Sequence, residues 1–131
     1  MRRRRLALLL SLFLLASSAS ATPLEVTVAQ LFAKPRQFDG RRVAVTGYYY
    51  ADSETSSLYV SAAAKKSLNE PSIWVQFRGT PDVTSIAGRY ARLVGTFHHK
   101  PTADPKRMNG YGTWGLSSAA LLDTTPFRAL R

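Results

Sequence analysis

The chain has 131 residues and no cysteine, and its 18 Lys and Arg against 8 Asp and Glu give a formal net charge of +10. The absence of cysteine excludes disulfides within this chain, cysteine-ligated zinc or iron–sulfur centres, and thiol catalysis. The length predicts one domain with a single core behind an N-terminal leader.

The first 21 residues have the three parts of a cleavable secretory signal peptide. Four arginines at 2–5 precede an apolar run at 6–16, which is shorter than the roughly 20 apolar residues that span a bilayer. The small residues Ala19-Ser20-Ala21 match an A-x-A cleavage site that would leave Thr22 as the mature N-terminus. A retained signal anchor and the twin-arginine route are the alternatives, whereas a lipoprotein would need a cysteine.

We therefore expect residues 22–131 to form one exported domain, periplasmic or extracellular, with no stable membrane anchor after cleavage. Because four of the 18 basic residues lie in the leader, the mature chain would carry 14 against 8 acidic residues, a net charge of +6. A moderate positive charge is compatible with anionic partners, but many exported proteins are basic without using that charge. Export also disfavours nucleic acid as the partner.

A short helix is expected at the start of the mature domain. Thr27 and Gln30 form a capping-box pattern, in which each side chain satisfies the backbone N–H of the other residue. Leu31 and Phe32 give this helix an apolar side, and Pro35 is expected to end it. A loop at 35–40 should then lead to the first long strand.

From residue 41 onward the apolar pattern has a period of two, which predicts β-strands. Five strands are expected, at 41–50, 58–61, 73–77, 90–98 and 111–116, the last resuming at 119–122. Gly47 inside the first strand predicts a bulge or a sharp bend. The segment 62–71 is predicted as a loop with a helical turn at 62–66.

Five short strands separated by turn signals predict a mainly β fold, a small five-stranded OB-fold-like barrel with a short N-terminal helix. A small β-sandwich is the alternative. The chain also resembles a group of small exported bacterial proteins that have an OB-fold-like barrel and a largely unassigned function. The resemblance is carried by 28–32 (VAQLF) with Pro35, 39–48 (DGRRVAVTGY), 58–61 (LYVS), 73–75 (IWV), 94–97 (VGTF) and 109–115 (NGYGTWG). It implies a fold and a compartment, not an activity.

No residue pattern predicts catalysis, a cofactor or a metal site. A serine nucleophile could use only His98 or His99 as its base, no G-x-S-x-G motif is present, and neighbouring residues in a strand point to opposite faces. A loop after His98 would be needed to bring His99 and Asp104 together around a metal ion. Asp52 and Glu54 share a polar turn, where solvent exposure explains them. A hydrolase is therefore only a remote alternative.

The candidate site is the outer face of the barrel. The residues expected to face inward are Val43, Val45, Leu58, Val60, Ile73, Val75 and Phe77. The residues that would then face outward, and that form the predicted ligand-binding set, are Tyr48, Tyr50, Tyr59, Trp74, Gln76 and Arg78. In OB-folds the second and third strands form the usual ligand face, where aromatic rings stack on bases or sugars.

This outer face predicts a non-enzymatic binding module for a glycan or a peptide. The alternative of a different class is an interaction or accessory protein of the bacterial envelope that uses the same face as a protein interface, a homodimer included. A structural explanation is also open. Strands favour aromatic residues, so these rings could simply pack under the N-terminal helix, the segment 62–71 or a neighbouring subunit.

Overall fold

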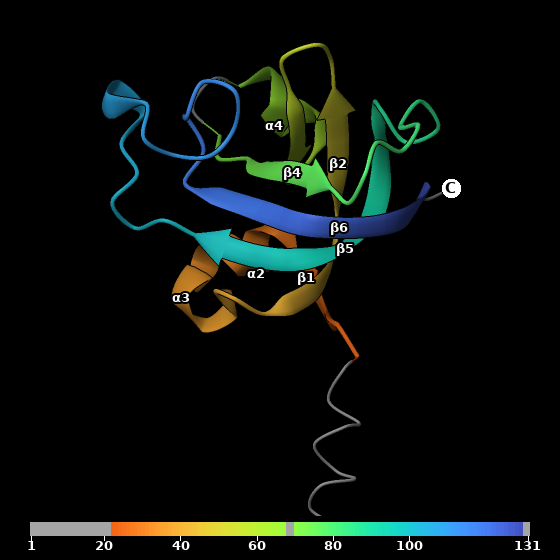
Figure 1. The fold of residues 1–131 in the computed structure, drawn as a ribbon, viewed down its shortest axis with the longest axis horizontal. Helices are drawn as coiled ribbons and strands as arrows, with labels where there is room; N and C mark the ends of the chain where they lie inside the picture. Colours follow the sequence, from red (N-terminus) through yellow and green to blue (C-terminus); the bar gives the residue numbers. More distant parts are fainter. Residues whose placement is uncertain (1–21, 68–69, 130–131) are drawn as a thin grey trace, which may run out of the picture.

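The computed structural model describes residues 22–67 and 70–129 (Figure 1). The predicted signal peptide lies outside the described residues. In chain order the elements are β1 (Leu24–Thr27), α2 (Val28–Ala33), α3 (Pro35–Phe38), β2 (Arg42–Ala51), β3 (Ser56–Tyr59), α4 (Ala62–Lys66), β4 (Ile73–Phe77), β5 (Arg89–His99), the 3-10 turn η2 (Pro105–Arg107) and β6 (Ala119–Ala129). Among the described helices none has the length and apolar character needed to cross a bilayer.

The sheet closes on itself. β2 pairs antiparallel with β3, and β3 pairs antiparallel with β4. β4 then runs parallel to β6, which pairs antiparallel with β5, and β5 returns to β2. Closure gives each barrel strand a neighbour on both sides and so removes open edges. The predicted mainly β, OB-fold-like barrel is confirmed over the sandwich alternative.

β1 is an extra strand that the sequence did not predict. It lies parallel to β2, with Leu24 opposite Val43 and Thr27 opposite Thr46. Its four residues are too few to display a clear alternation, and only Val26 is buried. β1 therefore owes its conformation to pairing with β2 and not to a pattern of its own.

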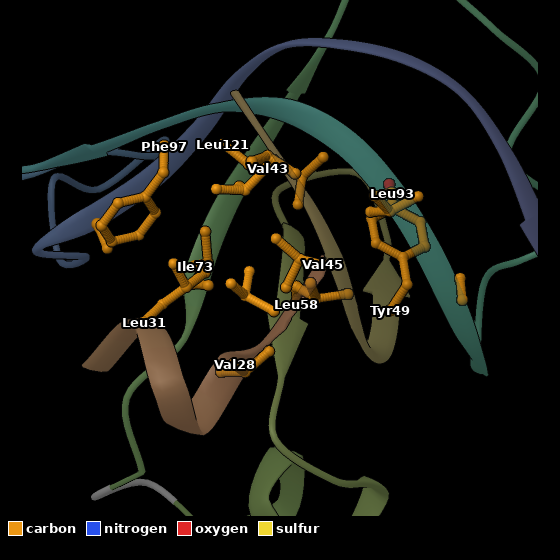
Figure 2. Close-up of a cluster of buried hydrophobic side chains, with 14 of the residues drawn as sticks. Val28, Leu31, Val43, Val45, Tyr49, Leu58, Ile73, Leu93, Phe97 and Leu121 are labelled. Carbon is orange, nitrogen blue, oxygen red and sulfur yellow. The ribbon is translucent and has the colours of Figure 1, made fainter. Parts of the chain in front are cut away.

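The N-terminal helix is confirmed together with its capping box. The Thr27 hydroxyl accepts the Gln30 N–H at 3.1 Å, and the Gln30 amide oxygen accepts the Thr27 N–H at 2.9 Å. α2 lays Leu31 against the interior of the barrel (Figure 2). Pro35 follows the end of α2 as expected. It also starts α3, where a proline is well tolerated because the first N–H of a helix has no partner, so the predicted loop at 35–40 is wrong.

The core fills the inside of the barrel (Figure 2). The predicted inward residues Val43, Val45, Leu58, Ile73 and Val75 are buried, and Phe77 packs partly buried against them. The largest fully buried side chains also include Tyr49, Leu93, Phe97 and Leu121. The inward residues of β2, β3 and β4 therefore follow the predicted period of two, although Ala44 and Ser57 beside them are buried as well.

Two predictions on strands are wrong. Residues 111–116 form no strand, because Gly112 and Gly115 have positive φ angles of 93° and 65° and turn the chain tightly. One isolated bridge, Tyr111 to Ser117, is formed there, and β6 supplies the fifth barrel strand. Val60, expected inward, is 45 % exposed, because β3 ends one residue before it.

Gly47 allows close packing of neighbouring segments and does not mark a β-bulge. The pairing of β2 with β5 runs from Arg42 to Tyr49 with no register shift. A Cβ at Gly47 would lie 2.8 Å from the Tyr59 carbonyl oxygen and 2.9 Å from Leu58 Cγ. Gly47 therefore permits a close approach at the point where the other edge of β2 passes from β1 to β3.

Candidate binding groove on the outer face of β3 and β4

The first row of predicted aromatics crosses the outer face between three strands. Tyr48 lies opposite Tyr59 of β3 on one side and opposite Tyr90 of β5 on the other. Directly opposed residues project to the same face of a sheet. The rings of Tyr48 and Tyr90 meet edge to face, with their centroids 5.5 Å apart, and the Tyr90 hydroxyl accepts the N–H of Ala62 at 3.2 Å. This row is therefore tied to the start of α4.

The second row combines two aromatics with a small polar residue. Tyr50 lies opposite Ser57, and Ser57 lies opposite Trp74. The Lys65 ammonium sits 3.9 Å from the centroid of the Tyr50 ring, so α4 covers that face of the ring. The hydrogen bond from the Tyr50 hydroxyl to Asp52, 3.1 Å long, raises the pKa of Tyr50.

A groove of about 590 Å³ lies over the end of these two rows. We call it the outer groove. Its floor is formed by Ser57 and Tyr59 of β3 and by Trp74 of β4. The rest of its lining comes from α4 with the residues after it, from the turn between β2 and β3, and from the loop 100–118 that connects β5 to β6.

The loop 100–118 is held in shape by hydrogen bonds within it and to the turn between β2 and β3. The Tyr111 N–H donates to the Ser117 carbonyl at 2.7 Å, and the Thr113 hydroxyl donates to the Glu54 carbonyl at 2.9 Å. Gly112 packs on the Trp74 indole, since a Cβ at Gly112 would lie 2.8 Å from Trp74 Cε3. The loop thus brings Tyr111 and the 53 % exposed Trp114 to the groove on a hydrogen-bonded backbone.

Only two of the six predicted ligand-binding residues line the outer groove. Tyr59 and Trp74 line the outer groove, whereas the lining of this groove among the described residues does not include Tyr48, Tyr50, Gln76 or Arg78. Tyr48 and Tyr50 are partly buried by their contacts with Tyr90 and Lys65, in keeping with the structural explanation that these aromatics pack under the segment 62–71. Gln76 is exposed.

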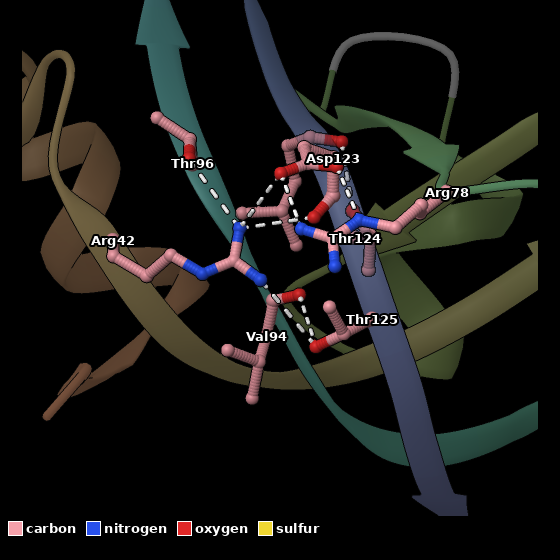
Figure 3. A network of polar contacts seen from close by, with 8 residues as sticks. Arg42, Arg78, Val94, Thr96, Asp123, Thr124 and Thr125 are labelled. Atoms are coloured by element: carbon pink, nitrogen blue, oxygen red, sulfur yellow. Dashed lines mark hydrogen bonds and ion pairs between the residues drawn. The ribbon is translucent and has the colours of Figure 1, made fainter. Parts of the chain in front are cut away.

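Arg78 belongs to a separate polar network at the β4–β6 junction (Figure 3). Its guanidinium donates two hydrogen bonds of 2.7 Å to the carboxylate of Asp123, and Arg42 lies 3.6 Å from the same carboxylate. The hydrogen bonds from Arg78 lower the pKa of Asp123. Asp123 has a φ of 50°, next to a register shift in the pairing of β6. Arg78 is therefore paired with the irregular part of β6 and lies outside the lining of the outer groove.

Most of the groove lining lies outside the predicted set, including the two aromatics of the loop and a serine of the floor. Tyr111 and Trp114 were assigned to a strand, although the alternation of glycine with aromatic residues in 109–115 was the available signal for a shaped loop. Ser57 was expected in the polar turn before the strand at 58–61, whereas it lies inside β3. Its position between Tyr50 and Trp74 is visible only once the strand register is known.

Within residues 22–67 and 70–129, no three His, Asp or Glu side chains are grouped so that they could hold a metal ion. His98 and His99 are the last residues of β5, and the backbone N–H of His99 donates to Asp39 at 2.9 Å. β5 thus continues through His99 and does not end at His98. A second, shallower hollow of about 440 Å³ lies beside His99 and α3, next to Lys34 and Arg36.

Comparison of the chain with protein-family models, with curated proteins and with solved structures found no match. The resemblance to exported bacterial proteins therefore stays a prediction. What the structure supports is the closed five-stranded barrel that this resemblance implied.

Proposed function

We propose that this protein is an exported, non-enzymatic binding module that takes its ligand into the outer groove. One observation carries the proposal: two residues of the predicted face, Tyr59 and Trp74, meet Tyr111 and Trp114 around a single groove of about 590 Å³. This volume falls within the range of roughly 300–1,000 Å³ that is typical of ligand sites. The second and third barrel strands are also the usual ligand face of OB-folds.

The shape of the groove supports binding without a large ordering cost. Immobilising a loop or a flexible side chain on binding lowers affinity, and a preformed site avoids that loss. The loop 100–118 is bonded internally and to the turn between β2 and β3, and Gly112 is packed on Trp74. The ligand would thus meet aromatic surfaces that already have their bound geometry.

Tryptophan fluorescence tests the proposal directly, because both tryptophans of the chain, Trp74 and Trp114, line the outer groove. We expect a saturable change in emission with at least one member of a panel made of neutral oligosaccharides, decaproline and heparin. Trp74→Ala should weaken the binding about 5- to 150-fold, as expected for the loss of a stacking contact worth 1–3 kcal/mol. Gln76→Ala, on the same strand and outside the groove, is the matched control and should bind normally.

Export is the second part of the proposal. It is supported by the basic residues at 2–5, the apolar run at 6–16 and the A-x-A site before Thr22. We expect N-terminal sequencing of the exported protein, expressed in a bacterium, to begin at Thr22. Recovery from membranes with Met1 intact would instead indicate a retained signal anchor.

A protein interface on the same side of the barrel is the second candidate function. Three large apolar side chains of the loop 100–118 are more than half exposed, namely Met108 at 53 %, Trp114 at 53 % and Leu116 at 54 %. Exposed apolar residues grouped on one loop are typical of a protein contact. Light scattering distinguishes this candidate: a stable dimer that Leu116→Ala disrupts would favour it over a ligand groove.

A further inference from the structure

The charges around the outer groove argue against a polyanion. Its charged lining residues among those described are Glu54, Glu70 and Lys65. The Lys65 ammonium already lies over the Tyr50 ring, and Arg78, the cation predicted for this face, is paired with Asp123. An anionic ligand would therefore meet two carboxylates against one ammonium, which is an unfavourable electrostatic match.

The floor of the groove carries a polar group that has no hydrogen bond within the described part of the chain. Ser57 is only 5 % exposed and lines the groove, yet its hydroxyl takes part in none of the hydrogen bonds found among the described residues. The neighbouring Ser56, on the inner side, bonds to both the Tyr49 hydroxyl and the Val75 carbonyl at 2.9 Å. Buried hydroxyls are normally bonded in this way. No side-chain polar atom in the described part is sealed off without a partner, so the Ser57 hydroxyl opens onto the groove.

These features select a ligand with apolar faces and hydroxyl edges. Trp74 and Trp114 offer apolar ring surfaces, and the Ser57 hydroxyl can both donate and accept. Glu54 and Glu70 carry carboxylates, which only accept hydrogen bonds when ionised. A proline-rich peptide stacks on aromatic rings, but proline has no N–H to donate to these carboxylates.

Resting on the proposed function, we propose that the outer groove binds an uncharged oligosaccharide made of pyranose units. A pyranose ring places its C–H face against Trp74 or Trp114 and a hydroxyl group on Ser57. The hydroxyls at the edge of the ring can donate hydrogen bonds to the carboxylates of Glu54 and Glu70. Ser57 is therefore the residue that distinguishes a hydroxylated ring from a merely apolar one.

The test uses cellotetraose and tetra-N-acetylchitotetraose, two uncharged oligosaccharides, with tryptophan emission as the readout. We expect saturable binding of at least one of them that hardly changes between about 50 and 500 mM NaCl, because no ion pairs form. Ser57→Ala should weaken this binding about 3- to 10-fold, the effect of one lost neutral hydrogen bond. Ser53→Ala, in the exposed turn outside the lining, is the matched control. Thermal melting by circular dichroism checks that both variants are folded.

The remaining probes separate the two ways in which the inference can fail. In the first case, neither oligosaccharide binds at about 10 mM, but heparin or decaproline binds and Trp74→Ala abolishes that binding. The saccharide assignment is then wrong, and the groove is still a binding site. If no probe changes the emission, both the saccharide assignment and the proposed function are overturned. If Ser57→Ala and the unmodified protein bound an oligosaccharide with equal affinity, Ser57 would not contribute to recognition of the saccharide.

Discussion

Leu31→Ala is expected to lower the free energy of unfolding by about 2–5 kcal/mol, the range measured for leucines deleted from protein cores. Leu31 is fully buried and projects from α2 into the cluster inside the barrel (Figure 2). α2 has only six residues, so it is too short to be stable without this packing. Urea unfolding followed by circular dichroism measures the change.

Leu24→Ala is the matched control for this prediction, because it makes the same substitution at a leucine of β1 that is 38 % exposed. The control should change the free energy of unfolding by less than about 1 kcal/mol, since much of this side chain is already in water. If both variants lost the same stability, α2 would not be docked on the core as described.

Gly47→Ala is expected to destabilise the barrel by about 3 kcal/mol, at the upper end of the range for overpacking. The added Cβ would lie 2.8 Å from both the Tyr59 carbonyl oxygen and Val28 Cγ2. A backbone oxygen between paired strands cannot move aside as the end of a flexible side chain can. The strands and α2 would have to separate, which thermal melting detects as a lower Tm.

Gly79→Ala separates this steric effect from the general cost of replacing a glycine. Gly79 has a φ of 71°, and a Cβ there would meet no atom within 4 Å. Its substitution should destabilise by about 1 kcal/mol through backbone strain alone. A loss at Gly47 no larger than the loss at Gly79 would contradict the close approach of β2 and β3.

The barrel could be predicted because its signals are local. Val43 and Val45 alternate with less apolar neighbours along one strand, and the capping box of Thr27 and Gln30 lies within four residues. Such patterns report directly on which face of a strand or which end of a helix a residue occupies. β1 was missed because its conformation depends on pairing with β2. The partner of Leu24 in this pairing is Val43, which lies 19 positions further along the chain.

The groove could be predicted only in part because its residues come from distant segments. Tyr59 and Trp74 were expected on the outer face from alternation alone, since each lies in a regular strand. The pairing of Arg78 with Asp123 was not predicted, because the two residues are 45 positions apart and no pattern marks Asp123 as the partner. Trp114 was assigned to a strand because aromatic residues favour strands, and the glycine-dependent turns of the loop overrode that preference.

The glycines of the loop 100–118 determine which positions of the loop can vary. A Cβ at Gly110 would lie 2.2 Å from the carbonyl oxygen of Ser117. A Cβ at Gly115 would lie 2.1 Å from the carbonyl oxygen of Met108. These positions hold the course of the chain and tolerate no side chain. Between them, Trp114 is exposed at the groove and does not belong to the barrel core, whereas the Thr113 hydroxyl helps to hold the loop through its bond to Glu54. Substitution of Trp114 can therefore change the lining of the outer groove while the course of the loop and the core of the barrel are preserved.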